Sequence, residues 1–105
     1  MKTVTAIIRP GKFPDVKEAL LDIGVEMMTV INVMGCGRQE GYTESHSKSS
    51  GEVNLIQKMK IEIIVAEEQV KQVVDAIIKR SKSGAIGDGK IFVTDAPQYM
   101  SISSR

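Results

Sequence analysis

The sequence has 105 residues, of which 42% are hydrophobic and 26% are charged, a balance typical of one soluble globular domain. Its formal net charge of +1 argues against a protein that binds nucleic acid or anionic membranes through bulk charge. No apolar run is long enough for a bilayer span or a secretory signal, and the single cysteine cannot form an intramolecular disulfide, so we expect a cytoplasmic protein without membrane insertion.

The N-terminal part of the chain predicts a strand followed by an amphipathic helix. Residues 3–9 are largely β-branched and aliphatic, and a Pro-Gly pair ends them. Apolar residues then recur at helical spacing, with Pro14 near the first turn and Gly24 just past the end. These residues are Val16, Ala19, Leu20 and Ile23.

Two long strands, a second helix and two short strands are predicted in the rest of the chain. The long strands cover 25–34 and 54–66, where apolar and polar residues alternate or β-branched residues dominate. The helix is indicated by apolar residues spaced along 70–78, with Gly84 as its exit, and the short strands lie at 91–93 and 99–102. This order predicts an α+β fold of the ferredoxin-like βαββαβ type in a single domain, 1–105.

The polar insert between the long strands, 35–53, is unusually long for a compact domain. Loops of this length are more often functional or mobile than merely connective. The alternative is a surface insertion that the fold tolerates and that has no function.

Two glycine clusters suggest a site for an anion. Residues 84–90 read GAIGDGK, and closely spaced glycines let backbone N–H groups converge on a phosphate while a lysine supplies charge. The order differs from a Walker A loop, so a tight turn between helix and strand is an equal alternative. The second cluster, 35–39, reads GCGRQ and adds a guanidinium suited to phosphate oxygens. We interpret Cys36 as a small packing residue.

Three blocks of the sequence, taken together, resemble the PII nitrogen-regulatory signalling proteins. They are GRQEGYTE at 37–44, KMKIEIIV at 58–65 and GAIGDGKIFV at 84–93. The resemblance covers nearly the whole chain without a gap. It implies a homotrimer of ferredoxin-like subunits that binds an adenine nucleotide in each cleft between neighbours. It also implies that a T-loop, about 37–53, docks into a target transporter or metabolic enzyme.

The resemblance also implies which residues form the site. Gly87, Asp88, Gly89 and Lys90, in a phosphate-binding loop at about 82–90, hold phosphates from one side, and Gly35, Gly37 and Arg38 approach from another. The adenosine is surrounded by Ile7, Thr29, Glu62 and Ile64. Gln39 contacts 2-oxoglutarate, and it contacts Mg²⁺ indirectly and only when the ion is bound with the nucleotide. Lys58 pairs with a carboxylate of 2-oxoglutarate. We expect the two glycine clusters to meet across a subunit boundary.

Departures from the family pattern concern the choice of ligand. Ser101 and Ser103, in the C-terminal segment 98–105, stand where typical members place phosphate-clamping arginines, so ADP or AMP is favoured and ATP remains possible. Glu40 stands where relatives often carry lysine, which puts 2-oxoglutarate sensing in doubt. Gly51 replaces the tyrosine that many relatives use for uridylylation, while Ser49 matches a serine phosphorylated in some relatives.

Three classes of function are compatible with these features. The leading one is a regulator without enzymatic activity. In one version it responds to nitrogen and energy status. In the other it is a divergent family member that binds ADP or AMP and bicarbonate and regulates inorganic-carbon uptake or carboxysome-linked metabolism. A nucleotide hydrolase lacks a convincing water-positioning group. A purely structural trimer is the third class, in which the glycine loops are only turns.

Overall fold

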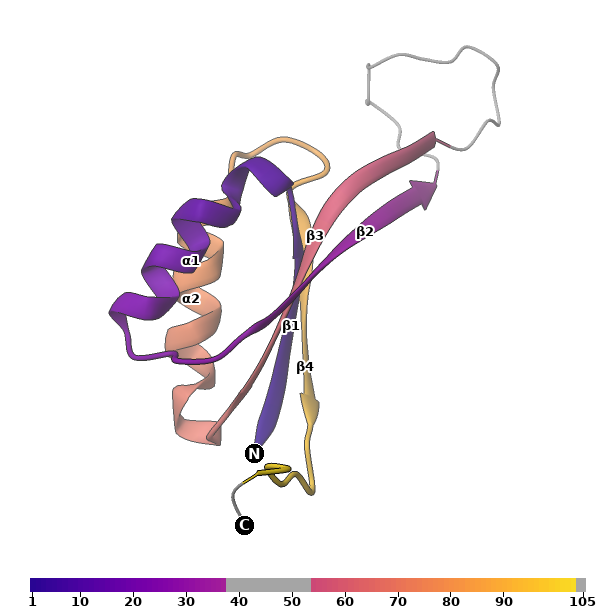
Figure 1. The fold of residues 1–105 in the computed structure, drawn as a ribbon. Coiled ribbons are helices and arrows are strands. Elements are labelled where there is room, and N and C mark those ends of the chain that lie inside the picture. The colour runs from indigo at the N-terminus through magenta and orange to yellow at the C-terminus, as the bar shows by residue number, and fades with distance from the viewer. Residues whose placement is uncertain (38–53, 104–105) are drawn as a thin grey trace.

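The computed structural model describes residues 1–37 and 54–103 of the chain (Figure 1). The elements follow the order strand, helix, strand, strand, helix, strand, with a short 3-10 turn before each helix. They are β1 (Lys2–Ile8), η1 (Pro10–Lys12), α1 (Phe13–Asp22), β2 (Thr29–Gly37), β3 (Asn54–Val65), η2 (Glu67–Gln69), α2 (Val70–Ser81) and β4 (Gly89–Asp95).

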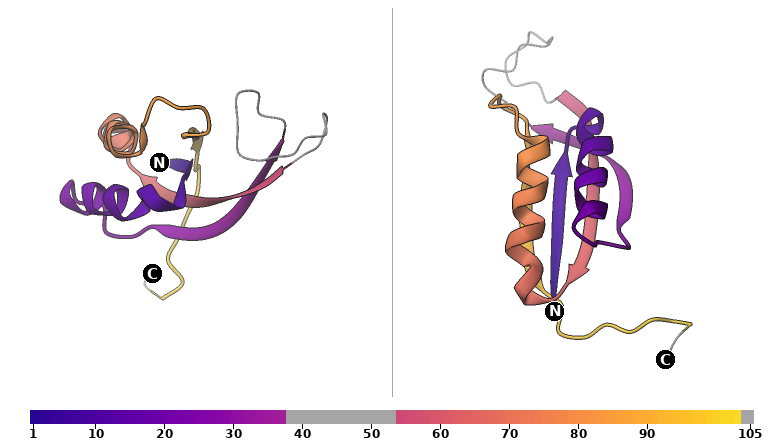
Figure 2. Two further views of the ribbon diagram at one scale, coloured as in Figure 1. Left: turned by 90° about the horizontal axis from the view of Figure 1, so that it is seen from above. Right: turned by 90° about the vertical axis from the view of Figure 1, so that its left-hand side faces the viewer.

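The four strands form one antiparallel sheet in the order β2-β3-β1-β4. Both helices cover the same face of this sheet, as the two views of Figure 2 show. Strand β1 is central and pairs along its length with β3 on one side and β4 on the other. This arrangement confirms the predicted ferredoxin-like fold.

The hydrophobic core lies between the helices and the sheet. Alternate residues of β1 and β3 point toward the helices and are buried, because successive side chains of a strand face opposite sides. The helices contribute the apolar residues that the spacing predicted, among them Leu20 of α1 and Ile77 of α2. The core therefore fixes which side chains of each strand are left on the opposite face.

That opposite face, here named the open face, carries no helix in the described chain (Figure 2). Its residues follow from the register, since directly paired residues of an antiparallel sheet share a face. From β2 and β3 they are Thr29, Ile31, Val33, Gly35, Ile56, Lys58, Lys60, Glu62 and Ile64; from β1 and β4 they are Thr3, Thr5, Ile7, Lys90, Phe92 and Thr94.

Two expectations about strands were wrong. Residues 99–102 are not a strand, because the chain leaves the end of β4 and runs away from the sheet, where no described strand lies beside it (Figure 2). Strand β2 begins later than predicted and continues through Gly35 to Gly37, which the sequence placed in the polar insert. Pairing with residues 54–56 of β3 extends this strand in spite of the low strand propensity of glycine.

Leu20 and Leu21 provide a test of the core, because neighbouring identical residues differ only in their environment. Leu20 is 0% exposed and Leu21 is 49% exposed. We expect Leu20→Ala to lower the free energy of unfolding by about 2–5 kcal/mol, because it leaves a cavity under α1. The matched variant Leu21→Ala is expected to lower it by less than about 1 kcal/mol. Urea denaturation of both variants measures the difference, and equal losses would contradict this core.

Candidate functional site

A pocket of about 640 Å³ lies at the end of the sheet where β1 finishes and β4 begins. All four strands and the loop between α2 and β4 contribute to its wall. The lining residues are Ile7, Gly35, Cys36, Ile56, Lys58, Ala85, Gly87, Asp88, Gly89, Lys90 and Phe92. Its volume lies in the range of pockets that hold small organic ligands.

The backbone of the loop before β4 requires glycine at two positions beside the pocket. Gly87 has φ +96° and Gly89 has φ +126°, a region that other residues adopt only with strain. A Cβ at Gly89 would lie 1.9 Å from the carbonyl oxygen of Ile7, so the close approach of β4 to β1 excludes any side chain there. Glycine at these two positions therefore allows the backbone to adopt the conformation that forms the pocket wall.

The carboxylate of Asp88 closes this loop by accepting hydrogen bonds from the start of the loop. Oδ2 accepts from the backbone N–H groups of Ser83, at 2.8 Å, and Gly84, at 2.9 Å, and Oδ1 accepts from the Ser83 hydroxyl. These bonds hold the pKa of Asp88 at about 2, below its usual value of 3.8, with the Ser83 hydroxyl as the largest cause. Asp88 is therefore ionised at neutral pH.

Arg9 and Lys58 hold the same loop by donating to its carbonyl groups. Arg9 Nη2 donates to the carbonyl of Ile86 at 2.8 Å, and Lys58 Nζ donates to that of Gly87 at 2.6 Å. Arg9 Nε also lies 3.5 Å from Asp88 Oδ1. Two cations from β3 and from the end of β1 thus converge on consecutive residues of the loop.

The pocket has an excess of positive charge. Burial lowers the pKa of Lys58, and the neighbouring charges of Arg9 and Lys90 lower it further, while Asp88 opposes the shift. Among the described residues, the cationic side chains of Arg9, Lys58 and Lys90 therefore act on one another here, and the carboxylate of Asp88 offsets them in part. An anionic ligand would relieve their mutual repulsion, so the residues present fit a phosphate or carboxylate group.

The structure brings together seven of the residues that the sequence predicted for the site. These are Ile7, Gly35, Lys58, Gly87, Asp88, Gly89 and Lys90. The two glycine clusters meet within one chain, so the expectation that a subunit boundary separates them was wrong. The cause is the length of β2 and β3, which pair as far as residues 37 and 54 and carry Gly35 to the pocket.

The other predicted residues do not line this pocket. Thr29, Glu62 and Ile64 lie on the open face, farther along the sheet, where Glu62 pairs with both Thr29 and Thr5. Gly37 ends β2 outside the lining, and Ser101 and Ser103 belong to the C-terminal segment that leaves the sheet. Arg38 and Gln39, with most of the predicted T-loop, lie outside the described residues.

Sequence reasoning missed Arg9 and misjudged Cys36. The contact of Arg9 with Ile86 joins residues 77 positions apart, and only its place directly after the first strand could have indicated it. Cys36 is an exposed residue of β2 at the pocket and is not buried packing, because it lies on the part of β2 that the core does not reach.

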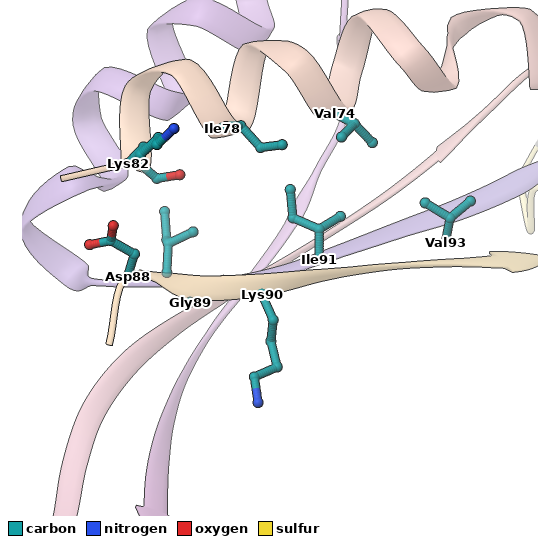
Figure 3. Close-up of a pocket in the computed structure, with 10 residues that line it drawn as sticks. Val74, Ile78, Lys82, Asp88, Gly89, Lys90, Ile91 and Val93 are labelled. Atoms are coloured by element: carbon teal, nitrogen blue, oxygen red, sulfur yellow. The ribbon is translucent and has the colours of Figure 1, made fainter. Parts of the chain in front are cut away.

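A second hollow, of about 460 Å³, lies on the other side of β4 under α2 (Figure 3). Its wall is mostly apolar, with Ile78 of α2 facing Ile91 and Val93 of β4. In this view the side chains of Asp88, just before β4, and Lys90, in β4, leave the backbone in opposite directions, Asp88 toward α2 and Lys90 away from it. The carboxylate and the ammonium group are therefore directed to different sides of the strand.

Comparison with known proteins gives consistent matches over the whole chain. A family model described as Nitrogen regulatory protein P-II matches residues 1–105. A protein named Nitrogen regulatory protein P-II from Porphyra purpurea is 48% identical over 102 residues, which cover 97% of this chain and 91% of the relative. Nitrogen regulatory protein P-II 1 of Escherichia coli (strain K12) is 46% identical over the same shares, and the P-II protein of Microchaete diplosiphon is 49% identical.

The titration of Asp88 tests the hydrogen bonds that close the loop. Because the pKa in the folded state lies below the usual value of 3.8, the stability contributed by the ionised carboxylate is complete above that value. This contribution is lost as the pH falls through about 2. We expect ¹³C NMR of the side-chain carboxyl to show a midpoint near that lower value, and Ser83→Ala to raise it. A wild-type midpoint at the usual value would mean that the loop is not closed in this way.

Proposed function

The chain belongs to the nitrogen regulatory protein P-II family, and on this premise we propose that it is a trimeric signalling protein without enzymatic activity. It binds an adenine nucleotide at the pocket beside 82–90 and controls a target transporter or metabolic enzyme through a T-loop at about 37–53. The observation that carries this proposal is one pocket lined by residues of both glycine clusters and by Lys58 and Lys90, with Arg9 bound to the loop in its wall.

The phosphates of the nucleotide would lie against the glycine loop. Lys90 is exposed at the start of β4 and supplies positive charge on the open face (Figure 3). Lys58 and Arg9 already donate to loop carbonyls, and each retains further N–H groups for a ligand oxygen. Charge-assisted bonds of this kind are about twice as strong as neutral ones, so the pocket favours anions.

The open face is the surface by which we propose that three copies assemble. Large apolar side chains on it are partly exposed in the single chain, namely Ile31, Ile64 and Phe92. Such a face is normally buried, and a chain of this size gains stability by burying it against copies of itself. Packing of open faces would also place a neighbouring chain beside each pocket, where Thr29, Glu62 and Ile64 would contact the adenosine.

The C-terminal segment is proposed to set the preference among nucleotides. Ser101 and Ser103 stand where the family pattern has arginines, and a hydroxyl brings no charge to the outer phosphates of ATP. ADP or AMP is therefore the favoured ligand, and ATP binds without its usual clamp. Lys58 supports 2-oxoglutarate as a second effector, whereas Glu40 opposes it by its charge.

A second candidate function follows from the same serines. A divergent family member that binds ADP or AMP together with bicarbonate would not need arginines at 101 and 103 to neutralise the outer phosphate of ATP. The positive charges of Lys58 and Arg9 suit an anion as small as bicarbonate. Such a protein would regulate inorganic-carbon uptake or carboxysome-linked metabolism. Either function places the protein in the cytoplasm, and neither described helix has the length and apolar character to cross a membrane.

Calorimetry with ADP, AMP and ATP tests the proposed site and its preference. We expect ADP or AMP to bind at least as tightly as ATP, and Lys90→Ala to weaken all three by about tenfold or more through loss of a charge-assisted bond. The double variant Ser101→Arg/Ser103→Arg should shift the preference toward ATP. Titrations repeated with 2-oxoglutarate and with bicarbonate separate the two candidate functions.

One result would contradict the nucleotide site, and another would contradict only the proposed preference. One is the failure of every adenine nucleotide to bind or to raise the melting temperature, because a ligand of the folded state must stabilise it. The other is a tenfold preference for ATP in the unmodified protein, which would remove the role given to the serines. Chromatography of the nucleotides after incubation checks that none is hydrolysed.

Ile31 and Ile78 provide a matched test of the assembly. Both are isoleucines with 44% exposure, but Ile31 lies on the open face and Ile78 lies on α2. We expect Ile31→Asp to convert the trimer to smaller species in light-scattering chromatography, because a charge would be buried without a partner. Ile78→Asp should leave the trimer intact. A monomeric wild-type protein, or dissociation by Ile78→Asp alone, would contradict the assembly through the open face.

A further inference from the structure

We propose that the side chain of Asp88 has a positioning role: its carboxylate holds the phosphate-facing loop in its binding shape through Ser83 and Gly84 and does not itself bind the nucleotide. This inference rests on the proposed nucleotide site and limits any contact of Asp88 with phosphates to its backbone.

The carboxylate of Asp88 is hydrogen-bonded within its own loop. Its oxygens accept three hydrogen bonds from Ser83 and Gly84, and Oδ1 also lies 3.5 Å from Arg9 Nε. Three of the roughly four acceptor sites of the carboxylate are therefore taken by donors of the same chain. A Mg²⁺ ion or a ligand hydroxyl would compete with these donors for the carboxylate.

The side chain of Asp88 points away from the open face. Asp88 leaves the backbone toward α2, whereas Lys90 leaves it toward the open face (Figure 3). A carboxylate directed at the ligand would also repel the phosphates that the pocket is proposed to bind. The geometry therefore separates the residue that shapes the loop from the residues that contact the anion.

The bonds of Asp88 join the two ends of the loop. Ser83 lies just after α2 and Asp88 just before β4, so the carboxylate closes a turn of six residues. Ser83 extends the cluster by accepting from the N–H of Ala85 at 3.2 Å. Between these ends, Arg9 and Lys58 hold the carbonyls of Ile86 and Gly87. With the turn closed, the loop needs no reordering when a phosphate binds, which reduces the entropic cost of binding.

A purely electrostatic role for Asp88 predicts the opposite effect of the same substitution. Removing a negative charge beside a phosphate site should strengthen binding, because Arg9, Lys58 and Lys90 would be less neutralised. In Asp88→Asn the side chain keeps one acceptor oxygen, but an NH₂ group replaces the second oxygen, so at least one donor of the loop, either a backbone N–H or the Ser83 hydroxyl, loses its acceptor. A positioning role therefore predicts weaker binding, and the sign of the change distinguishes the two.

The experiment compares ADP affinity in four proteins by calorimetry. We expect Asp88→Asn to raise the Kd of ADP by about tenfold or more, and Ser83→Ala, which leaves every charge in place, to raise it by roughly threefold to tenfold. Ser83→Thr retains the hydroxyl and should restore affinity close to wild type. The matched control is Asp95→Asn at the other end of β4, where the carboxylate pairs with Lys2, and its Kd should not change.

Amide hydrogen exchange of the ligand-free proteins provides a readout that does not depend on nucleotide. The N–H groups of Ser83, Gly84 and Ala85 should exchange faster in Asp88→Asn and Ser83→Ala, while those of β1 and β3 stay protected. The effects of the two substitutions on Kd should be less than additive in the double variant, because they break one cluster. If wild type binds no nucleotide while these amides are protected, the proposed function fails and the loop closure stands.

Three results would overturn the inference. Tighter ADP binding by Asp88→Asn would assign the residue a purely electrostatic effect. Unchanged exchange at the three amides in Asp88→Asn would show that the carboxylate does not order the loop. Faster exchange with unchanged affinity in both variants would show that loop order does not matter for binding.

Discussion

The pairing of β1 with both β3 and β4 is the constraint on which the site depends. In this register Ile7 lies opposite Lys60 on one side and Lys90 on the other, so three strands reach the same end of the sheet together. Arg9, directly after β1, then meets the loop that leads into β4. A shift by one residue would move these side chains to the helix-covered face and bury the lysines in the core. The core residues between sheet and helices therefore also fix the geometry of the anion site.

The manner in which the cations are held explains how the pocket stays open to an anion. Arg9 and Lys58 donate to backbone carbonyls, which are neutral acceptors, and the carboxylate of Asp88 accepts hydrogen bonds from Ser83 and Gly84. Arg9 also forms an ion pair with Asp88, with 3.5 Å between Nε and Oδ1, which offsets part of its charge. Because the carbonyl groups carry no net charge, the cations still attract an incoming anion.

Much of the fold could be predicted from the sequence because it depends on local periodicity. The spacing of Val73 and Ile77 identified α2, and the alternation around Ile61 identified β3. Predictions failed where a distant partner decides the outcome: residues 99–102 have strand propensity but no described strand to pair with, whereas Gly35 joins β2 because β3 lies beside it. Arg9 was missed for the same reason, since nothing in the residues around it indicates a contact with Ile86.

The sequence could predict which residues form the site, but not the direction in which the side chain of Asp88 points. The glycines and Lys90 were recognised from spacing and charge, which depend on residue type alone. Whether Asp88 faces the ligand depends on the turn at Ser83, and that turn brings a carboxylate back onto amides five and four residues earlier. The sequence pattern therefore identifies the loop, while only the folded conformation shows that the carboxylate of Asp88 turns back onto the loop itself.

The placement of these residues also separates affinity from selectivity. The glycine loop, Arg9, Lys58 and Lys90 lie at one end of the sheet within a single chain, and their charge suits an anion such as a phosphate. The serines at 101 and 103 lie on a segment that leaves the sheet and is held to it by no described strand pairing (Figure 2). If these serines set the choice of nucleotide as we propose, substitutions that change this choice would fall outside the strands and helices that form the core.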